Sequence, residues 1–185
     1  MTIDVGTGDG RAVIATALAQ PATLAIGIDA DAASMAEASR RAARGAARGG
    51  APNALFIVAA AEAFPPELAG VAAHVTVTMP WGSLLRGCLG GAPEVAAGLA
   101  GLLGPAAILE LLVAPATRDR LADLPTEPED VLRAIAAAFE PCGLRLVKGR
   151  PASAEELRAS RSSWARRLLA SRGADRTTIL ARLRS

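Results

Sequence analysis

The sequence predicts an α/β fold of the Rossmann-like type, with a sheet of seven mostly parallel strands and helices on both faces. Seven short apolar segments of strand type alternate with helical segments along the 185 residues, which is typical of this class. A glycine-rich turn joins the first strand to the first helix, and candidate binding residues follow the next two strands as well. Open α/β sheets bind ligands at this carboxyl edge.

The first half of the chain contains four of the expected strands. Apolar runs bounded by turn residues predict them at residues 2–5, 23–29, 54–60 and 72–80. Two helices lie between them, at 11–19 and 31–50. In the second of these, Asp31 is a candidate N-cap, and Gly49 and Gly50 are expected to end the helix.

The second half continues the alternation. Strands are expected at 105–113, 144–149 and 176–183, and helices at 94–103, 127–143 and 153–172. Ser153 and Glu156 have the spacing of a capping box at the start of the last helix. We find no repeat or linker, and therefore expect one domain over residues 1–185.

The charge, the apolar runs and the Cys and His residues of the chain limit the classes of function to consider. The net charge is +2, and no apolar run approaches the roughly 20 residues that cross a bilayer. The N-terminus has no export signal, so a cytoplasmic protein without membrane contact is expected. Cys88, Cys142 and His74 lack the spacing of metal ligands, so we expect no metal site and a structural role for His74.

The turn "DVGTGDG", residues 4–10, indicates a nucleotide-type site. Its glycines let the backbone approach a ligand, and the following helix directs amide groups toward it. Arg11 stands where the dinucleotide fingerprint requires a third glycine, so NAD is disfavoured. The pattern instead resembles the (D/E)xGxGxG motif of class I S-adenosylmethionine-dependent methyltransferases. We expect this cofactor to be bound by residues of the turn, namely Asp4, Gly6, Thr7, Gly8 and Asp9.

Two further strand ends match that class. Asp29 ends the second strand, where the class places an acid that receives the ribose hydroxyls, and Ala61 and Glu62 follow the third strand, where it contacts adenine. Each feature has a plainer alternative. A glycine-rich turn occurs in many α/β proteins, and Asp29 could be a helix N-cap or a solvated acid.

A tryptophan follows the fourth strand in "MPWGSLL", although only 3% of the residues are aromatic. Together with "DVGTGDGR", "IGIDAD", "AAAEAFPPEL" and "SSWARRL", this segment resembles the 16S rRNA (adenine-1408-N1)-methyltransferases that confer aminoglycoside resistance. The resemblance implies that Trp81 and Trp164 hold a flipped-out adenine between them. It also implies that the Pro80 carbonyl meets the adenine amino group, with Ser83 and Ser162 flanking the pocket. The alternative is that both indoles only pack the fold.

The resemblance also implies two arginine clusters that contact RNA. All basic residues except Lys148 are arginine, and Arg40, Arg44 and Arg48 are expected to share one face of the second helix. The residues that are expected to contact RNA are Arg40, Arg41, Arg44, Arg48, Arg166, Arg167 and Arg172. The expected substrate is the 30S ribosomal subunit, and the expected enzyme is a monomer.

Two rival functions stay open at this stage. A small-molecule methyltransferase would share the cofactor turn but has no use for arginine clusters. A non-enzymatic RNA-binding relic is suggested by the start of the sequence, which lies inside the first strand, whereas the family has a further segment before it. Salt-dependent substrate binding would separate the first rival, and loss of cofactor binding the second.

Overall fold

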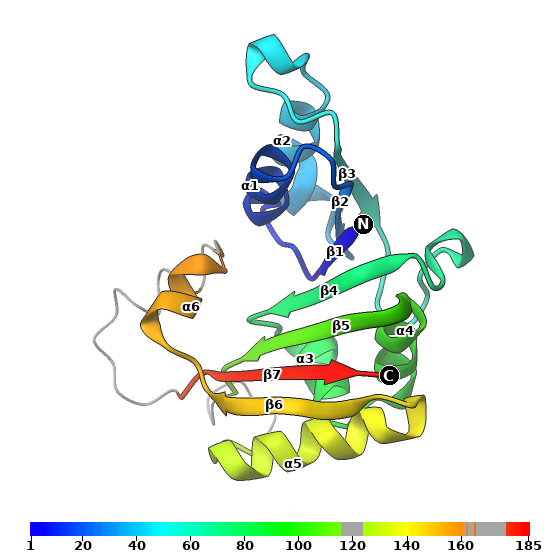
Figure 1. Ribbon diagram of the computed structural model, residues 1–185, viewed down its shortest axis with the longest axis vertical. Coiled ribbons are helices and arrows are strands. Elements are labelled where there is room, and N and C mark those ends of the chain that lie inside the picture. Colours follow the sequence, from blue (N-terminus) through cyan, green and yellow to red (C-terminus); the bar gives the residue numbers. More distant parts are fainter. Residues whose placement is uncertain (116–123, 161, 163–164, 166–176) are drawn as a thin grey trace.

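The computed structural model describes residues 1–115, 124–160, 162, 165 and 177–185, and it confirms the predicted α/β class (Figure 1). One sheet contains seven strands in the order β3-β2-β1-β4-β5-β7-β6. All neighbouring strands pair in parallel except β7, which is antiparallel to both β5 and β6. The strands are β1 (Thr2–Val5), β2 (Ala25–Asp29), β3 (Ala54–Val58), β4 (Ala72–Thr78), β5 (Leu103–Val113), β6 (Arg145–Pro151) and β7 (Ile179–Arg184).

Helices cover both faces of this sheet. Among the described residues they are α1 (Arg11–Ala19), α2 (Ala32–Ala42), α3 (Gly82–Cys88), α4 (Pro93–Gly101), α5 (Pro128–Phe139) and α6 (Ala154–Ala159), with short 3-10 helices η1 (Ala46–Arg48), η2 (Pro66–Leu68) and η4 (Glu140–Cys142). Alternate residues of β2 show the two layers. Ala25 packs with α1 and α2, whereas Ile26 and Ile28 belong to the larger core beneath α3, α4 and α5. No helix within the described ranges is long and apolar enough to span a membrane.

The helix expected over residues 31–50 is shorter than predicted. Asp31 is its N-cap as expected, with a side-chain oxygen accepting the Ala33 N–H at 2.9 Å, but α2 ends at Ala42. The chain then doubles back, so that the Ala51 N–H donates to the Ala42 carbonyl and Ala51 is fully buried. A side chain at Gly50 would collide with the Arg44 backbone. This tight return to β3 overrides the helical tendency of the arginine-rich segment.

Two further differences concern where elements begin. Helix α3 begins directly after Trp81, in a segment where the sequence analysis places no helix. The expected helix over 153–172 is described only as α6, and Ser153 and Glu156 form the predicted capping box at its start. β7 begins at Ile179, three residues later than expected.

Candidate cofactor and target-base site

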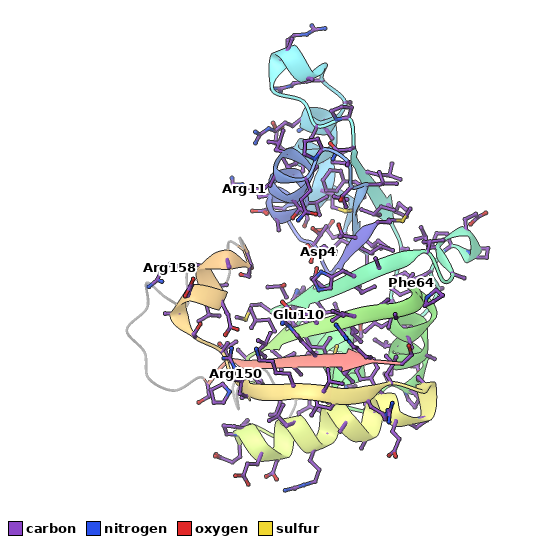
Figure 2. All side chains as sticks on the ribbon, in the orientation of Figure 1. Asp4, Arg11, Phe64, Glu110, Arg150 and Arg158 are labelled. Carbon is purple, nitrogen blue, oxygen red and sulfur yellow. The ribbon has the colours of Figure 1, made fainter. Side chains whose placement is uncertain are left out.

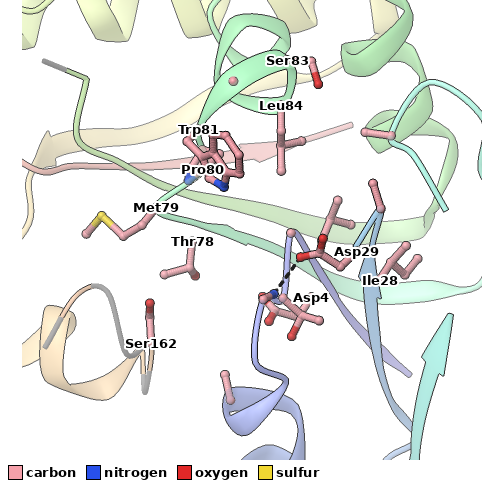
Figure 3. Close-up of a pocket in the computed structure, with 18 of the residues that line it drawn as sticks. Asp4, Ile28, Asp29, Thr78, Met79, Pro80, Trp81, Ser83, Leu84 and Ser162 are labelled. Atoms are coloured by element: carbon pink, nitrogen blue, oxygen red, sulfur yellow. Dashed lines mark hydrogen bonds between the residues drawn. The ribbon is translucent and has the colours of Figure 1, made fainter. Parts of the chain in front are cut away.

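A cavity of about 690 Å³ opens at the carboxyl edge of the sheet, where β1, β2, β3 and β4 end (Figure 3). It brings together residues that lie far apart in the sequence. Every described residue predicted for the cofactor or the target base lines it: Asp4, Gly6, Thr7, Gly8, Asp9, Asp29, Ala61, Glu62, Pro80, Trp81, Ser83 and Ser162. The segments that the sequence analysis linked to one ligand therefore share one cavity.

The glycine-rich turn has a backbone that only glycine adopts without strain. Gly6, Gly8 and Gly10 have φ values of 71°, 57° and 66°. A Cβ on Gly6 would lie 2.7 Å from Leu84 of α3, and one on Gly10 would lie 2.5 Å from Phe56 of β3. Gly8 meets nothing within 4 Å. A side chain at Gly6 or Gly10 would therefore clash with the packing of the fold, whereas Gly8 borders open space at the cavity.

Asp29 is held in place by backbone amides. One carboxylate oxygen accepts the Gly8 N–H at 2.8 Å, and the other accepts the Asp31 N–H at 3.0 Å. The first contact ties β2 to the glycine-rich turn (Figure 3). Because Asp31 is the N-cap of α2, the alternative that Asp29 caps the helix is wrong. A carboxylate has about four acceptor sites, so Asp29 keeps capacity for hydroxyl donors in the cavity.

Asp4 provides negative charge at the inner wall. Its carboxylate accepts a hydrogen bond from the Thr76 hydroxyl at 2.7 Å. Burial raises the pKa of Asp4, although this hydrogen bond opposes the shift. Nearby, the Thr7 hydroxyl is buried without a hydrogen-bond partner among the described residues. A buried carboxylate and an unpaired hydroxyl fit a ligand that is both cationic and polar, as S-adenosylmethionine is.

The loop after β3 forms another wall. Helix α4 approaches this loop so closely that a Cβ on Gly98 would lie 2.2 Å from the Ala61 carbonyl oxygen. Ala61 is half-buried, whereas Glu62 is exposed at the rim. Ser83 lies in the first turn of α3 and is also exposed. The wall is therefore apolar at Ala61 and polar at its two edges.

Trp81 is presented outward by an unusual backbone. Met79 has a φ of 52°, which is rare for a residue with a side chain, and its N–H donates to the Leu112 carbonyl at 2.7 Å. Met79 itself is buried, but Trp81 is 84% exposed. Strained backbone that the surrounding structure holds in place is common at functional sites. The alternative that Trp81 packs the core is wrong.

The opposite side of the cavity includes the region after α6. Arg150 of β6 binds both carboxylate oxygens of Glu156, at 2.9 and 2.5 Å, and so ties α6 to the sheet. The Ser162 hydroxyl accepts the Ala165 N–H at 3.3 Å, and Ser162 lines the cavity. Trp164 lies outside the described residues.

The first arginine cluster differs from the expectation. Arg40 and Arg41 lie on α2, but Arg44 follows the end of this helix and Arg48 lies in η1, so Arg40, Arg44 and Arg48 do not share one helical face. All four side chains are exposed. Arg40 pairs with Glu37 at 2.8 Å. The second cluster of Arg166, Arg167 and Arg172 lies outside the described residues.

Sequence reasoning missed three residues that shape this site. Thr76 holds Asp4 from the neighbouring strand, Leu84 fills the space above Gly6, and Phe56 packs beneath Gly10. A polar residue inside an alternating strand was a usable signal for Thr76. Leu84 and Phe56 have ordinary apolar environments in the sequence, so only the packing identifies their role.

Comparisons with known proteins agree with this geometry. A profile of the family NpmA, 16S rRNA (adenine(1408)-N(1))-methyltransferase, matches residues 1–183. A protein of that description from Streptoalloteichus hindustanus is 43% identical over 187 residues, which cover 98% of this chain and 85% of the relative. A second, from Streptoalloteichus tenebrarius, is 39% identical over 186 residues, with coverage of 98% and 85%.

Solved structures give the same result. A mutant 16S rRNA (adenine(1408)-N(1))-methyltransferase from Catenulisporales acidiphilia, crystallised with the cosubstrate SAM, has a TM-score of 0.87 and 34% identity, covering 100% of this chain and 84% of its own. The 16S rRNA methyltransferase KamB has a TM-score of 0.86 and 34% identity, with coverage of 99% and 86%. The resemblance and the cofactor predicted from the sequence are confirmed. The chain belongs to the 16S rRNA (adenine(1408)-N(1))-methyltransferases, a family of S-adenosylmethionine-dependent enzymes.

Proposed function

We propose that this chain methylates N1 of adenine 1408 in 16S rRNA, that it acts on the assembled 30S subunit in the cytoplasm, and that it thereby confers aminoglycoside resistance. The observation that carries this proposal is the 84% exposed indole of Trp81 at the mouth of the cofactor cavity. An apolar ring of this size gains nothing from exposure to water. It is suited to stack on a base that has left its helix.

The chemistry needs positioning more than it needs an acid or a base. Adenine N1 has an in-plane lone pair and no proton, so it attacks without a general base. S-adenosylmethionine supplies an electrophilic methyl group on a cationic sulfur. The residues of this chain have to hold the base in line and exclude water, a contribution that can reach several kcal/mol.

Trp81 would serve both needs. Stacking of a base on an aromatic side chain contributes about 1–3 kcal/mol, which offsets the loss of stacking in the RNA. As methylation makes the adenine ring cationic, the indole face attracts the developing positive charge. Trp164 is proposed as the second stacking surface, on the opposite side of the base.

The remaining cavity residues have polar roles. The Pro80 carbonyl is proposed to accept a hydrogen bond from the adenine amino group, while Ser83 and Ser162 flank the bound ligands. Asp29 is proposed to bind the ribose hydroxyls of the cofactor. The hydrogen bonds from Gly8 and Asp31 support this role, because they fix the carboxylate before the ligand arrives.

Basic side chains would supply most of the affinity for RNA. Arg40, Arg41, Arg44 and Arg48 are exposed between α2 and β3 and are proposed to contact the phosphate backbone. Arg166, Arg167 and Arg172 are proposed to do the same beyond α6. A monomer with both clusters would recognise the shape of the assembled subunit.

The test is methyl transfer from radiolabelled S-adenosylmethionine to purified 30S subunits, followed by reverse transcription of the 16S rRNA. We expect incorporation of label and a stop one nucleotide before adenine 1408, because a methyl group on N1 prevents base pairing. Cells that express the chain are expected to tolerate kanamycin and apramycin. Incorporation at another position, or none with cofactor bound, would contradict the proposal.

A further inference from the structure

On the outer face of β6 and β7, four basic residues form two cross-strand pairs. In the antiparallel register, Arg145 lies opposite Arg184, and Lys148 lies opposite Arg182. The register shifts between Leu146 and Lys148, so a bulge at Val147 keeps both basic residues of β6 in phase with those of β7. We name these four residues, Arg145, Lys148, Arg182 and Arg184, the β6–β7 basic face.

This face points away from the main core. Arg182 and Arg184 alternate along β7 with Ala181 and Leu183, which are buried in the core that includes α5. On β6, a Cβ at Gly149 would contact Leu132 of α5, whereas Lys148 beside it is exposed. In Figure 1, α5 runs along one side of β6, and no described helix crosses the other side of β6 and β7.

The charges on this face are largely uncompensated. Glu110 of β5 pairs with Arg182 at 2.6 Å, and Figure 2 shows Glu110 on the sheet beside β7. Within the described ranges, Arg145, Lys148 and Arg184 form no ion pair. Like charges directly opposite each other on neighbouring strands destabilise a sheet. Two such pairs in succession are a cost that a bound polyanion would relieve.

We propose that the β6–β7 basic face is an additional docking surface for the phosphate backbone of the rRNA substrate, an inference that rests on the proposed function. None of its four residues lines the cofactor cavity, so the face would add affinity without entering the chemistry. Arginine side chains bind phosphate oxygens through two parallel N–H groups, which suits a pair of arginines at Arg145 and Arg184. The face is distinct from the cluster between α2 and β3, which lies at the other end of the sheet.

The test compares three variants for binding to 30S subunits across a series of salt concentrations. Lys148→Gln and the double variant Arg145→Gln/Lys148→Gln remove charge from the face. Arg133→Gln is the matched control, because Arg133 is an exposed cation on α5, on the opposite side of the sheet. We expect the double variant to bind 30S subunits about tenfold more weakly at 0.1 M salt, with a log–log salt slope smaller by about 1 to 2.

Three controls separate the possible results. Cofactor affinity and the methylation rate at saturating 30S should equal those of the parent, and the melting temperature should not fall, since the substitutions remove repulsion. If Lys148→Gln and the double variant bind 30S like Arg133→Gln, the proposal is overturned. Weaker binding with an unchanged salt slope would also overturn it, because phosphate contacts release counterions. If the parent methylates no 30S, the proposed function fails instead.

Discussion

The two halves of the cavity are built in different ways. The cofactor half is closely packed, with Gly10 held against Phe56 and Asp29 fixed by two backbone amides. The target half presents an open surface, where Met79 adopts a left-handed backbone and Trp81 is 84% exposed. Both halves lie at the same sheet edge, within one cavity.

This difference indicates how the two ligands are recognised. The cofactor half is organised before its ligand binds, so little ordering cost remains. The target half leaves apolar surface uncovered until a base arrives. Substitutions in the cofactor half should therefore affect stability or cofactor affinity, whereas substitutions in the target half should affect methylation alone.

The largest effect on stability is expected for Gly10→Ala. The new Cβ would meet Phe56 at 2.5 Å and the Ala38 Cβ at 2.7 Å, and the φ of 66° adds strain. Overpacking and a left-handed backbone together predict a loss of about 3 kcal/mol in the free energy of unfolding. Urea unfolding without cofactor measures it. Gly8→Ala is the matched control, with similar φ but no contact within 4 Å, and a loss of only about 1 kcal/mol is expected.

Asp29→Ala is expected to weaken cofactor binding about 100-fold. It removes the proposed acceptor of two hydroxyls and also the partner of the Gly8 N–H. Calorimetric titration with S-adenosylmethionine measures the affinity. Asp31→Ala provides the comparison, since it removes the cap of α2 and should leave that affinity nearly unchanged. Equal affinity in the Asp29 variant and the parent would contradict the proposed ribose contact.

Asp4→Asn is expected to raise the stability of the fold while it weakens cofactor binding. Burial raises the pKa of Asp4, so the folded chain binds a proton more readily than the unfolded chain does, and its stability falls as pH rises through the folded pKa. The amide should therefore raise the melting temperature at pH 8 by a few degrees and weaken cofactor binding. The gain should shrink as pH falls toward about 3.9, the ordinary value for Asp. A lower melting temperature at pH 8 would argue against this electrostatic cost.

The smallest effect is expected for Glu156→Gln. The contacts with Arg150, followed by the Ser153 N–H, lower the pKa of Glu156 to about 2. Its ionised form therefore stabilises the fold above the ordinary pKa near 4.3, and this contribution is lost as pH falls toward about 2. For a partly exposed pair we expect less than about 1 kcal/mol at pH 7. Chemical unfolding of variant and parent at pH 7 and pH 3 measures it, and the difference between the two should be smaller at pH 3 than at pH 7.

Much of the fold was predictable from local patterns. The alternation of apolar strands and helices, the glycine-rich turn and the caps at Asp31 and Ser153 all depend on residues near each other in the sequence. The end of α2 was not predictable, because it depends on the burial of Ala51 and on the close approach of Gly50 to Arg44. Such contacts form only when the chain returns to the sheet.

The candidate site was predictable to a similar extent. The motifs located the cavity residues from Asp4 to Ser162, since ligand contacts follow strand ends in this class. The supports of these residues were not visible. Thr76 reaches Asp4 across neighbouring strands, and the strained backbone of Met79 has no signature in the sequence.

The central claim is that the two halves of the cavity act separately, and Trp81→Ala tests it most directly. The measurement is the single-turnover rate of methyl transfer to adenine 1408, alongside cofactor affinity and melting temperature of the same variant. We predict a rate about 10- to 100-fold lower, from the loss of stacking, with cofactor affinity and melting temperature unchanged. A full rate, or a matching loss of cofactor affinity, would contradict the account.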